Sequence, residues 1–258
     1  MRRWFVLPML TMFTAAHAAP ALSIAVTDDM AHCIEALDAA FIAEHPDTTI
    51  ELTAGNDAAL AAKAAGGAFD VFVASDVETP RRLAQSGHAV LATLKPYGVG
   101  RLALWTNTPG INPGRGRTVL TAASTMKIAL LDASSAYGRA ATAAMARIGV
   151  AEAVQGKLVP DADLGATMRR VQSGEAEVGF VPYSLLLAPP LQGVGIYILV
   201  PGGAYEPPLQ AAIVTQHGAD NALAKAYVSF LGSAKARQIL EDNGYEAPLG
   251  SGPTRRTN

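Results

Sequence analysis

Short apolar runs alternate with stretches of helical periodicity along the first half of the chain. In the helical stretches apolar residues recur three and four positions apart, whereas the runs between them lack polar alternation. Uninterrupted apolar strands are typical of parallel sheets that helices cover on both faces. The predicted strands are residues 22–27, 49–52 and 70–74, and the predicted helices are residues 34–41, 58–65 and 79–85. Their βαβαβα order predicts a doubly wound α/β lobe.

The same alternation continues through the rest of the chain. The predicted strands are residues 101–105, 127–131, 178–181 and 209–215, and the predicted helices are residues 139–148, residues 164–171 and segments within residues 221–243. A passage rich in proline and glycine, residues 201–208, precedes the last of these strands. This repetition predicts further α/β structure. The polar residues 250–258 predict a disordered tail.

The start of the chain predicts an export signal. Arg2 and Arg3 precede an apolar run at residues 4–13, and residues 16–18 (AHA) place small residues where a signal peptidase reads. The run is shorter than the ~20 apolar residues that span a bilayer, and no later stretch is long and apolar enough. We therefore expect residues 1–18 to be removed as a signal peptide and the mature protein to lie in the periplasm.

Composition and charge narrow the class of partner. The formal net charge of −2 becomes −4 when Arg2 and Arg3 leave with the signal peptide. A nucleic-acid partner would call for a basic face, so this charge argues against one. The single cysteine, Cys33, cannot form an internal disulfide, and it lies too far beyond the cleavage site to carry a lipid anchor. We expect an exported protein that is not embedded in the membrane.

Polar turns follow four of the predicted strands. They carry Asp28 and Asp29, residues 55–57 (GND), residues 132–138 and residues 182–184 (PYS). In open α/β sheets, ligands bind outside the carboxyl ends of the strands. Several of these turns also begin helices, whose free N–H groups suit an anion. The sequence therefore predicts a ligand site at these turns.

A series of short motifs runs through the mature chain in a fixed order. They are residues 69–72 (FDVF), 74–76 (ASD), 100–105 (GRLALW), 157–159 (KLV), 173–177 (SGEAE), 179–181 (GFV), 218–221 (GADN), 230–231 (FL), 236–237 (AR) and 244–245 (GY). Together, at this spacing, they resemble the periplasmic molybdate-binding proteins, the substrate-binding components of ABC transporters.

The resemblance implies a type II periplasmic binding protein fold, with two doubly wound α/β lobes joined by two hinge strands. One lobe would comprise residues 19–97 and 206–258, and the other residues 98–205. The cleft between the lobes would hold a tetrahedral oxyanion such as molybdate or tungstate. This oxyanion would be cargo, and no cofactor is implied.

The resemblance also implies a ligand set of hydroxyl groups and backbone N–H groups at helix starts. Such fixed neutral donors hold an anion without a buried cation. The contact at Leu164 would be its backbone amide, and Tyr183 lies one place after the tyrosine of the better-known members. The candidate ligand-binding residues are Thr27, Asp28, Asp29, Asn56, Asp57, Ser135, Tyr137, Leu164 and Tyr183.

Asp29 departs from the family pattern, which has Ser or Asn at this position. An ionised carboxylate accepts hydrogen bonds and donates none, and about 4 Å from a dianion it would cost several kcal/mol. Asp29 would therefore be protonated, turn away, or cap a helix. Capping is also open to Asp28, and for Asp57, which opens the next helix, it is the favoured interpretation. If these carboxylates face the cleft ionised, they favour a different cargo: a metal cation, an amine, or a protonated oxyanion whose O–H donates to them.

A metal site is a separate hypothesis for residues 28–33 (DDMAHC). Imidazole and sulfur ligands suit copper or zinc, and carboxylates suit harder cations. On a helix, however, His32 and Cys33 diverge by ~100°, so we expect one of them to face the core. A buried free cysteine commonly acts as a small hydrophobe. We therefore predict no metal site.

Two other classes of function agree less well with the sequence. Ser134, Ser135, Ser184 and His217 would be the nucleophile and base candidates of an enzyme, but the chain has no Gly-x-Ser-x-Gly elbow and no Gly-Lys-Ser/Thr phosphate motif. We therefore predict no catalysis. A regulator's ligand-binding domain shares the fold. However, a regulator would need no export signal and would carry a DNA-binding segment, and neither expectation agrees with this sequence. The resemblance implies instead a monomer that docks on a membrane permease and its ATPase.

Overall fold

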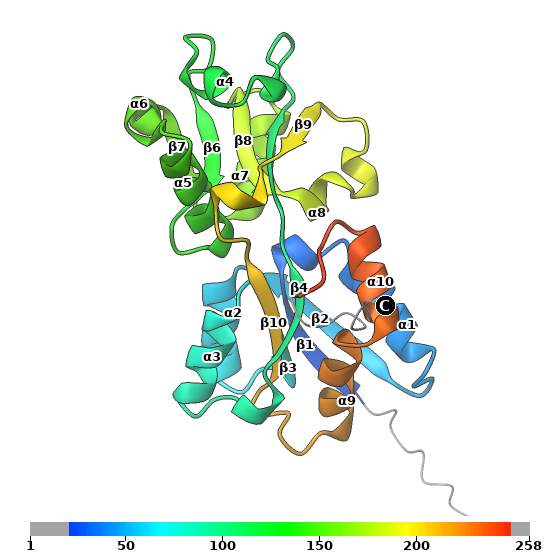
Figure 1. Cartoon of the computed structure of the whole chain (residues 1–258). Coiled ribbons are helices and arrows are strands. Elements are labelled where there is room, and N and C mark those ends of the chain that lie inside the picture. The colour runs from blue at the N-terminus through cyan, green and yellow to red at the C-terminus, as the bar shows by residue number, and fades with distance from the viewer. Residues whose placement is uncertain (1–20, 249–258) are drawn as a thin grey trace, which may run out of the picture.

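The computed structural model describes residues 21–248, and their strands form two five-stranded sheets (Figure 1). The first sheet has the order β2-β1-β3-β10-β4 and the second the order β7-β6-β8-β5-β9. The first contains β1 (Ala21–Thr27), β2 (Thr49–Gly55), β3 (Val71–Ala74), β4 (Lys95–Val99) and β10 (Leu209–Val214). The second contains β5 (Leu102–Thr106), β6 (Ile128–Leu131), β7 (Leu158–Asp161), β8 (Val178–Pro182) and β9 (Ile196–Leu199). The predicted signal peptide and polar tail lie outside the described residues.

Each sheet and its helices make one lobe, which we call the first and the second lobe in that order. The helices of the first lobe are α1 (Ile34–Ile42), α2 (Asp57–Ala65), α3 (Glu78–Gln85), α9 (Ala222–Leu231) and α10 (Ala234–Asp242). Those of the second lobe are α4 (Arg117–Thr121), α5 (Ala136–Arg147), α6 (Ala151–Val154), α7 (Leu164–Gln172) and α8 (Tyr183–Leu186). The predicted class, two α/β lobes, is confirmed.

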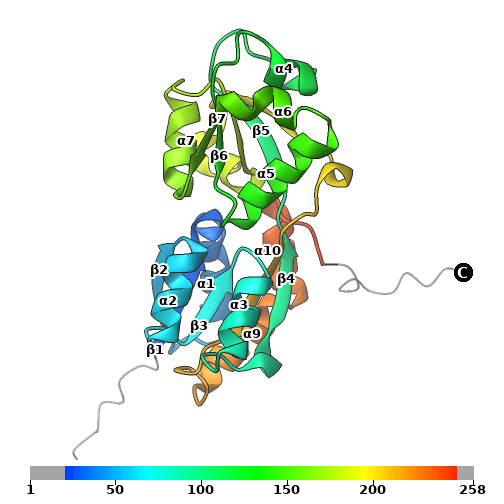
Figure 2. The same cartoon turned by 90° about the vertical axis from the view of Figure 1, so that its left-hand side faces the viewer.

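The first sheet is covered on both faces because the side chains of its strands alternate. In β1, Leu22, Ile24 and Val26 pack with α1, α9 and α10, whereas Ala25 packs on the opposite face with α2 and α3. Figures 1 and 2 show these two helical layers on either side of the sheet. Since both faces are buried, the strands carry the nearly continuous apolar sequence noted above.

The second sheet lies between α5 and α7, which Figure 2 shows on opposite sides. Its strand β5, which lies between β8 and β9, carries Trp105, which is fully buried. The indole N–H of Trp105 donates to the carbonyl oxygen of Val194 at 2.9 Å, so the ring is both packed and hydrogen-bonded. One apolar cluster joins the strands and helices of this lobe.

The chain passes between the two sheets twice. The first crossing joins β4 to β5 at residues 100–101, and the return crossing, residues 200–208, contains a short 3-10 helix, Gly202–Ala204, before β10. The crossings lie side by side, since the N–H of Gly100 donates to the carbonyl oxygen of Pro208 at 2.8 Å. The lobe boundaries predicted at residues 97/98 and 205/206 stay a prediction.

Some elements follow from tertiary contacts and not from local sequence. The sequence analysis did not predict β7, which pairs in parallel with β6, and it treated residues 182–184 as a turn where α8 (Tyr183–Leu186) begins. It also gave no direction for β10, which runs antiparallel to both β3 and β4. The predicted helix at residues 139–148 begins earlier, at Ala136, because Ser135 caps it.

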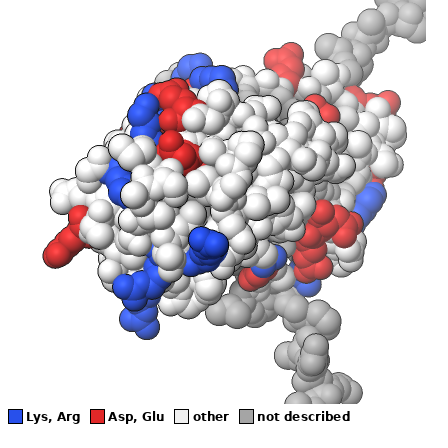
Figure 3. Space-filling view, turned by 90° about the horizontal axis from the view of Figure 1, so that it is seen from above, with Lys and Arg blue, Asp and Glu red and all other residues white. Residues whose placement is uncertain are grey.

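Between residues 21 and 248, no helix has both the length and the apolar character that crossing a membrane requires. Figure 3 shows basic and acidic side chains scattered among uncharged ones on the second-lobe end of the molecule. That face therefore carries no extended basic surface.

Candidate functional site

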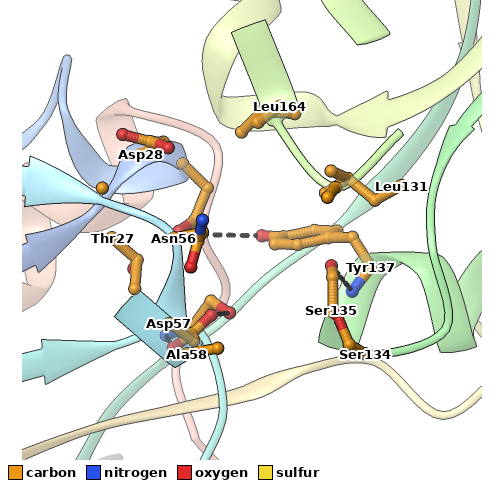
Figure 4. A pocket seen from close by; sticks show the side chains of 14 residues that line it. Thr27, Asp28, Asn56, Asp57, Ala58, Leu131, Ser134, Ser135, Tyr137 and Leu164 are labelled. Atoms are coloured by element: carbon orange, nitrogen blue, oxygen red, sulfur yellow. Dashed lines mark hydrogen bonds between the residues drawn. The ribbon is translucent and has the colours of Figure 1, made fainter. Parts of the chain in front are cut away.

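A cavity of about 210 Å³ lies between the two lobes. Its walls are the turns that follow β1, β2 and β3 in the first lobe and β6 and β7 in the second. In Figure 4, Thr27, Asn56 and Asp57 face Tyr137, Leu164 and Ser135 across the cavity. The carboxyl ends of strands from both sheets thus meet at one site, as expected for an open α/β fold.

Three helices begin at this cavity, α2 from the first lobe and α5 and α7 from the second. Side chains cap part of each N-terminus: Asn56 accepts from the N–H of Ala59 at 2.8 Å, and Asp163 from that of Gly165 at 2.8 Å. The Ser135 hydroxyl accepts from the N–H groups of residues 137 and 138. The remaining N–H groups of each first turn have no partner within the helix and carry the positive end of its dipole.

Asp29 lies at the base of the cavity and is only 3% exposed. Its Oδ2 accepts from the side-chain amide of Gln210 at 2.5 Å and from the hydroxyl of Tyr137 at 3.2 Å. Its backbone carbonyl accepts from the hydroxyls of Ser184 at 3.0 Å and Tyr245 at 2.8 Å. Because Tyr137 and Ser184 belong to the second lobe, this one residue holds contacts across the cleft.

Burial raises the pKa of the Asp29 carboxyl to about 7, and the nearby carboxylate of Asp57 adds to the effect. The Thr27 hydroxyl and the hydrogen bonds from Gln210 and Tyr137 act in the opposite direction. At neutral pH a large fraction of the Asp29 side chains is therefore neutral, which is unusual for an aspartate.

The other two aspartates of the cavity wall differ from Asp29. Asp57 accepts hydrogen bonds from the N–H of Ser75 at 3.1 Å and from its hydroxyl, and burial raises its pKa to about 6. Asp28 is half-buried, and burial followed by repulsion from Asp163 raises its pKa. None of the three caps a helix: Thr27 and Asn56 occupy the N-cap positions, so the capping interpretation is wrong.

Residues 22–246 match the family described as bacterial extracellular solute-binding protein. The chain belongs to this family. The molybdate-binding protein ModA of Azotobacter vinelandii is 35% identical over 181 residues, which cover 70% of this chain and 71% of that protein. That of Rhodobacter capsulatus is 34% identical over 181 residues and covers 70% of each. The resemblance to molybdate-binding proteins is therefore confirmed.

Solved structures show the same fold. The periplasmic molybdate-binding protein of Azotobacter vinelandii superposes with a TM-score of 0.79 at 26% identity, over 88% of this chain and 99% of that one. Iron-bound HitA of Pseudomonas aeruginosa superposes with a TM-score of 0.61 at 16% identity, over 91% and 90% of the two chains, and so shares the fold alone.

The structure of this solute-binding protein brings most of the predicted ligand residues together. Those that line the cavity are Thr27, Asp28, Asp29, Asn56, Asp57, Ser135, Tyr137 and Leu164. Tyr183 does not line it. Its ring packs against Tyr197, with centroids 5.5 Å apart, and lies 5.2 Å below the guanidinium carbon of Arg101. The short helix α8 begins at Tyr183 and turns the ring away from the cavity.

Sequence reasoning missed two residues that hold Asp29, namely Gln210 and Tyr245. Gln210 is the one polar side chain within the apolar strand β10 and is fully buried, and this interruption was a usable signal. Its amide oxygen accepts from Tyr97, which fixes the amide so that its nitrogen faces Asp29. Tyr245 belongs to the motif at residues 244–245 (GY), but the sequence analysis assigned it no role.

The metal and enzyme hypotheses find no matching arrangement in the part of the chain that the structure describes. No group of three or more His, Cys, Asp and Glu side chains is placed to hold a metal ion there. Cys33 is buried in the first-lobe core with Met30. His217 follows the C-terminal end of β10, which pairs with the start of β3, whereas the cavity lies beyond the C-terminal end of β3. Ser134 and Ser135 line that cavity and are therefore remote from His217.

Proposed function

We propose that this protein is the periplasmic capture component of an ABC importer and that its cargo is a tetrahedral oxyanion, molybdate or tungstate. The observation that carries this proposal is the cavity at which helices of both lobes begin. Their N–H groups and the Ser135 hydroxyl offer neutral donors from two sides, and no Lys or Arg of the described part of the chain lines the wall. Fixed dipoles of this kind favour an anion.

Two aspartates of the cavity wall are compatible with an anionic cargo because neighbouring residues donate hydrogen bonds to their carboxyl oxygens. Asp57 is engaged by Ser75, and Oδ2 of Asp29 is engaged by Gln210 and Tyr137. The contacts proposed for the oxyanion come from the lining residues, with the backbone amide of Leu164 among them. The molybdate-binding ModA relatives support the choice of cargo.

The two lobes and the two crossings between them support a capture mechanism in which contacts between the lobes add to the contacts of the ligand when the cleft is closed. Besides the Asp29 contacts, Arg139 of α5 pairs with Asp76 of the first lobe at 2.8 Å. These contacts exist only when the lobes are close. We propose that the protein acts as a monomer and presents the rims of both lobes to a membrane permease and its ATPase.

Calorimetry of the mature protein should show one molybdate or tungstate bound per chain, without turnover. Sulfate, the smaller tetrahedral dianion, should bind more weakly, because fixed donors match one size of anion. A panel of divalent metal ions should produce no binding heat. Binding of a metal ion together with no heat from any oxyanion would overturn the proposed cargo.

Ser135→Ala should lower both stability and oxyanion affinity. The hydroxyl caps α5, so its loss costs about 1 kcal/mol of unfolding free energy, and the lost contact to the anion weakens affinity about tenfold. The matched control is Ser233→Ala, which removes the corresponding cap of α10 away from the cavity. It should cost similar stability in urea denaturation while calorimetry shows unchanged affinity. Equal affinities in both variants would contradict the contact.

A further inference from the structure

Two buried polar atoms on the cavity wall make no well-aligned hydrogen bond among the described residues, although the Thr27 hydroxyl lies near enough to the Asp29 carboxyl to lower its pKa. They are Oγ1 of Thr27 and Oδ1 of Asp29, in side chains 2% and 3% exposed. Both residues line the cavity. Buried polar atoms of a folded protein almost always have a partner, so an orphaned pair at a cavity points to a ligand that supplies one.

The two oxygens of the Asp29 carboxyl have different surroundings. Oδ2 receives donors from Gln210 at 2.5 Å, Tyr137 at 3.2 Å and Tyr245 at 3.5 Å. Oδ1 receives none. A proton on Oδ2 would compete with these donors, whereas a proton on Oδ1 would make that oxygen a donor and leave every existing bond intact. The geometry therefore places an added proton on Oδ1.

Among residues 21–248, no cationic side chain contributes to the environment of Asp29 and offsets its charge. The titratable groups around it are Asp28 on its own turn, Asp57 of α2, Cys33 before α1, Tyr97 of β4, Tyr137 of α5 and Tyr245 near the C-terminal end of the described chain. A dianion in the cavity would repel an ionised Asp29 strongly, because the site is buried. Burial already holds the pKa of Asp29 near 7, so the neutral form is available at neutral pH.

We propose that Asp29 binds the oxyanion in its protonated form, donating Oδ1–H to the cargo beside the hydroxyl of Thr27. The proposal rests on the proposed function and adds a specificity-determining residue to it. Above about pH 7, capture of a dianion then takes up a proton from solution. The site selects anions whose oxygens can accept, and its affinity depends on pH even where the anion does not titrate.

The expected pH dependence follows from linkage. Below about pH 7 most Asp29 side chains carry the proton, and the affinity for the anion is constant. Above about pH 7 this affinity falls about tenfold for each pH unit. Molybdate titrations at about pH 8, in buffers of different ionisation enthalpy, should show uptake approaching one proton per anion. This measurement uses the unaltered protein, so it does not depend on how any variant folds.

Asp29→Asn replaces the protonated carboxyl with an amide of the same shape. Its oxygen can accept from Gln210 and Tyr137, and its N–H₂ can donate to the anion. Molybdate should bind to this variant without proton uptake and with an affinity that does not change with pH, about tenfold tighter than wild type at about pH 8. Asp29→Ala, which has no donor, should bind more weakly at about pH 6.

The matched control is Asp38→Asn. Asp38 is another buried carboxyl, with a pKa raised to about 6, but it lies on α1 and accepts from Tyr227 away from the cavity. This variant should keep the wild-type proton uptake. Uptake that disappears in Asp57→Asn and persists in Asp29→Asn would overturn the proposal.

Two further outcomes separate this inference from the proposed function. Molybdate binding by the wild type with no proton uptake at any pH would overturn the role of Asp29 and leave the cargo intact. Loss of binding by Asp29→Asn at every pH would show that the site needs a carboxylate acceptor, and would also overturn it. Failure of the wild type to bind any oxyanion would overturn both.

Discussion

Replacing Gly138 by alanine should abolish oxyanion binding and destabilise the second lobe by several kcal/mol. A Cβ atom at this position would lie 1.8 Å from the carbonyl oxygen of Asp132 and 2.4 Å from that of Leu131. Both obstacles are backbone, so relief requires the first turn of α5 to move away from the end of β6. Ser135 and Tyr137 would move with it, and both line the cavity. Urea denaturation and molybdate calorimetry measure the two effects.

Gly156→Ala is the matched control for this prediction. Gly156 lies in the short 3-10 helix Gln155–Lys157 of the same lobe, and a Cβ there would meet no atom within 4 Å. Its unfolding free energy should stay within about 0.5 kcal/mol of wild type, with unchanged affinity. If Gly138→Ala also retained wild-type affinity, α5 would not be the rigid support of the site that the structure indicates.

The position of the site could be predicted from the sequence because it depends on a general property of α/β sheets. Strands such as β1 and β3 can be recognised by their uninterrupted apolar sequence, and ligands of open α/β sheets bind at the turns after the carboxyl ends of such strands. That argument pointed to Asn56 and Ser135, which follow strands of different sheets and line the same cavity. It needed no knowledge of side-chain orientation.

The orientation of the site residues could not be predicted, because it depends on partners far away in the chain. Asp29 turns toward Gln210, 181 residues later, and Tyr137, 108 residues later. Local preference suggested capping for Asp57, yet its partner is Ser75 and the neighbouring Asn56 caps α2. Tyr183 was expected at the cavity from its place after β8, but α8 begins there and directs the ring elsewhere.

Asp29→Asn should stabilise the unliganded protein at neutral pH and do little near pH 4. The carboxyl of Asp29 has a pKa of about 7 in the folded protein and an ordinary value of 3.8 when exposed by unfolding. Between these values the folded state binds more protons than the unfolded state, so wild-type stability falls as pH rises. The amide does not titrate and avoids this loss.

The stability difference between variant and wild type should therefore grow from about pH 4 to about pH 7 and stay constant above. The gap between the two pKa values limits the gain to at most about 4 kcal/mol. Urea denaturation across this range measures it, and the other titrating groups cancel in the difference. Asp38→Asn should show the same sign with a plateau near pH 6, since the pKa of Asp38 is about 6. A difference for Asp29→Asn that does not vary with pH would mean that its carboxyl titrates alike in the folded and unfolded protein, against the burial seen here.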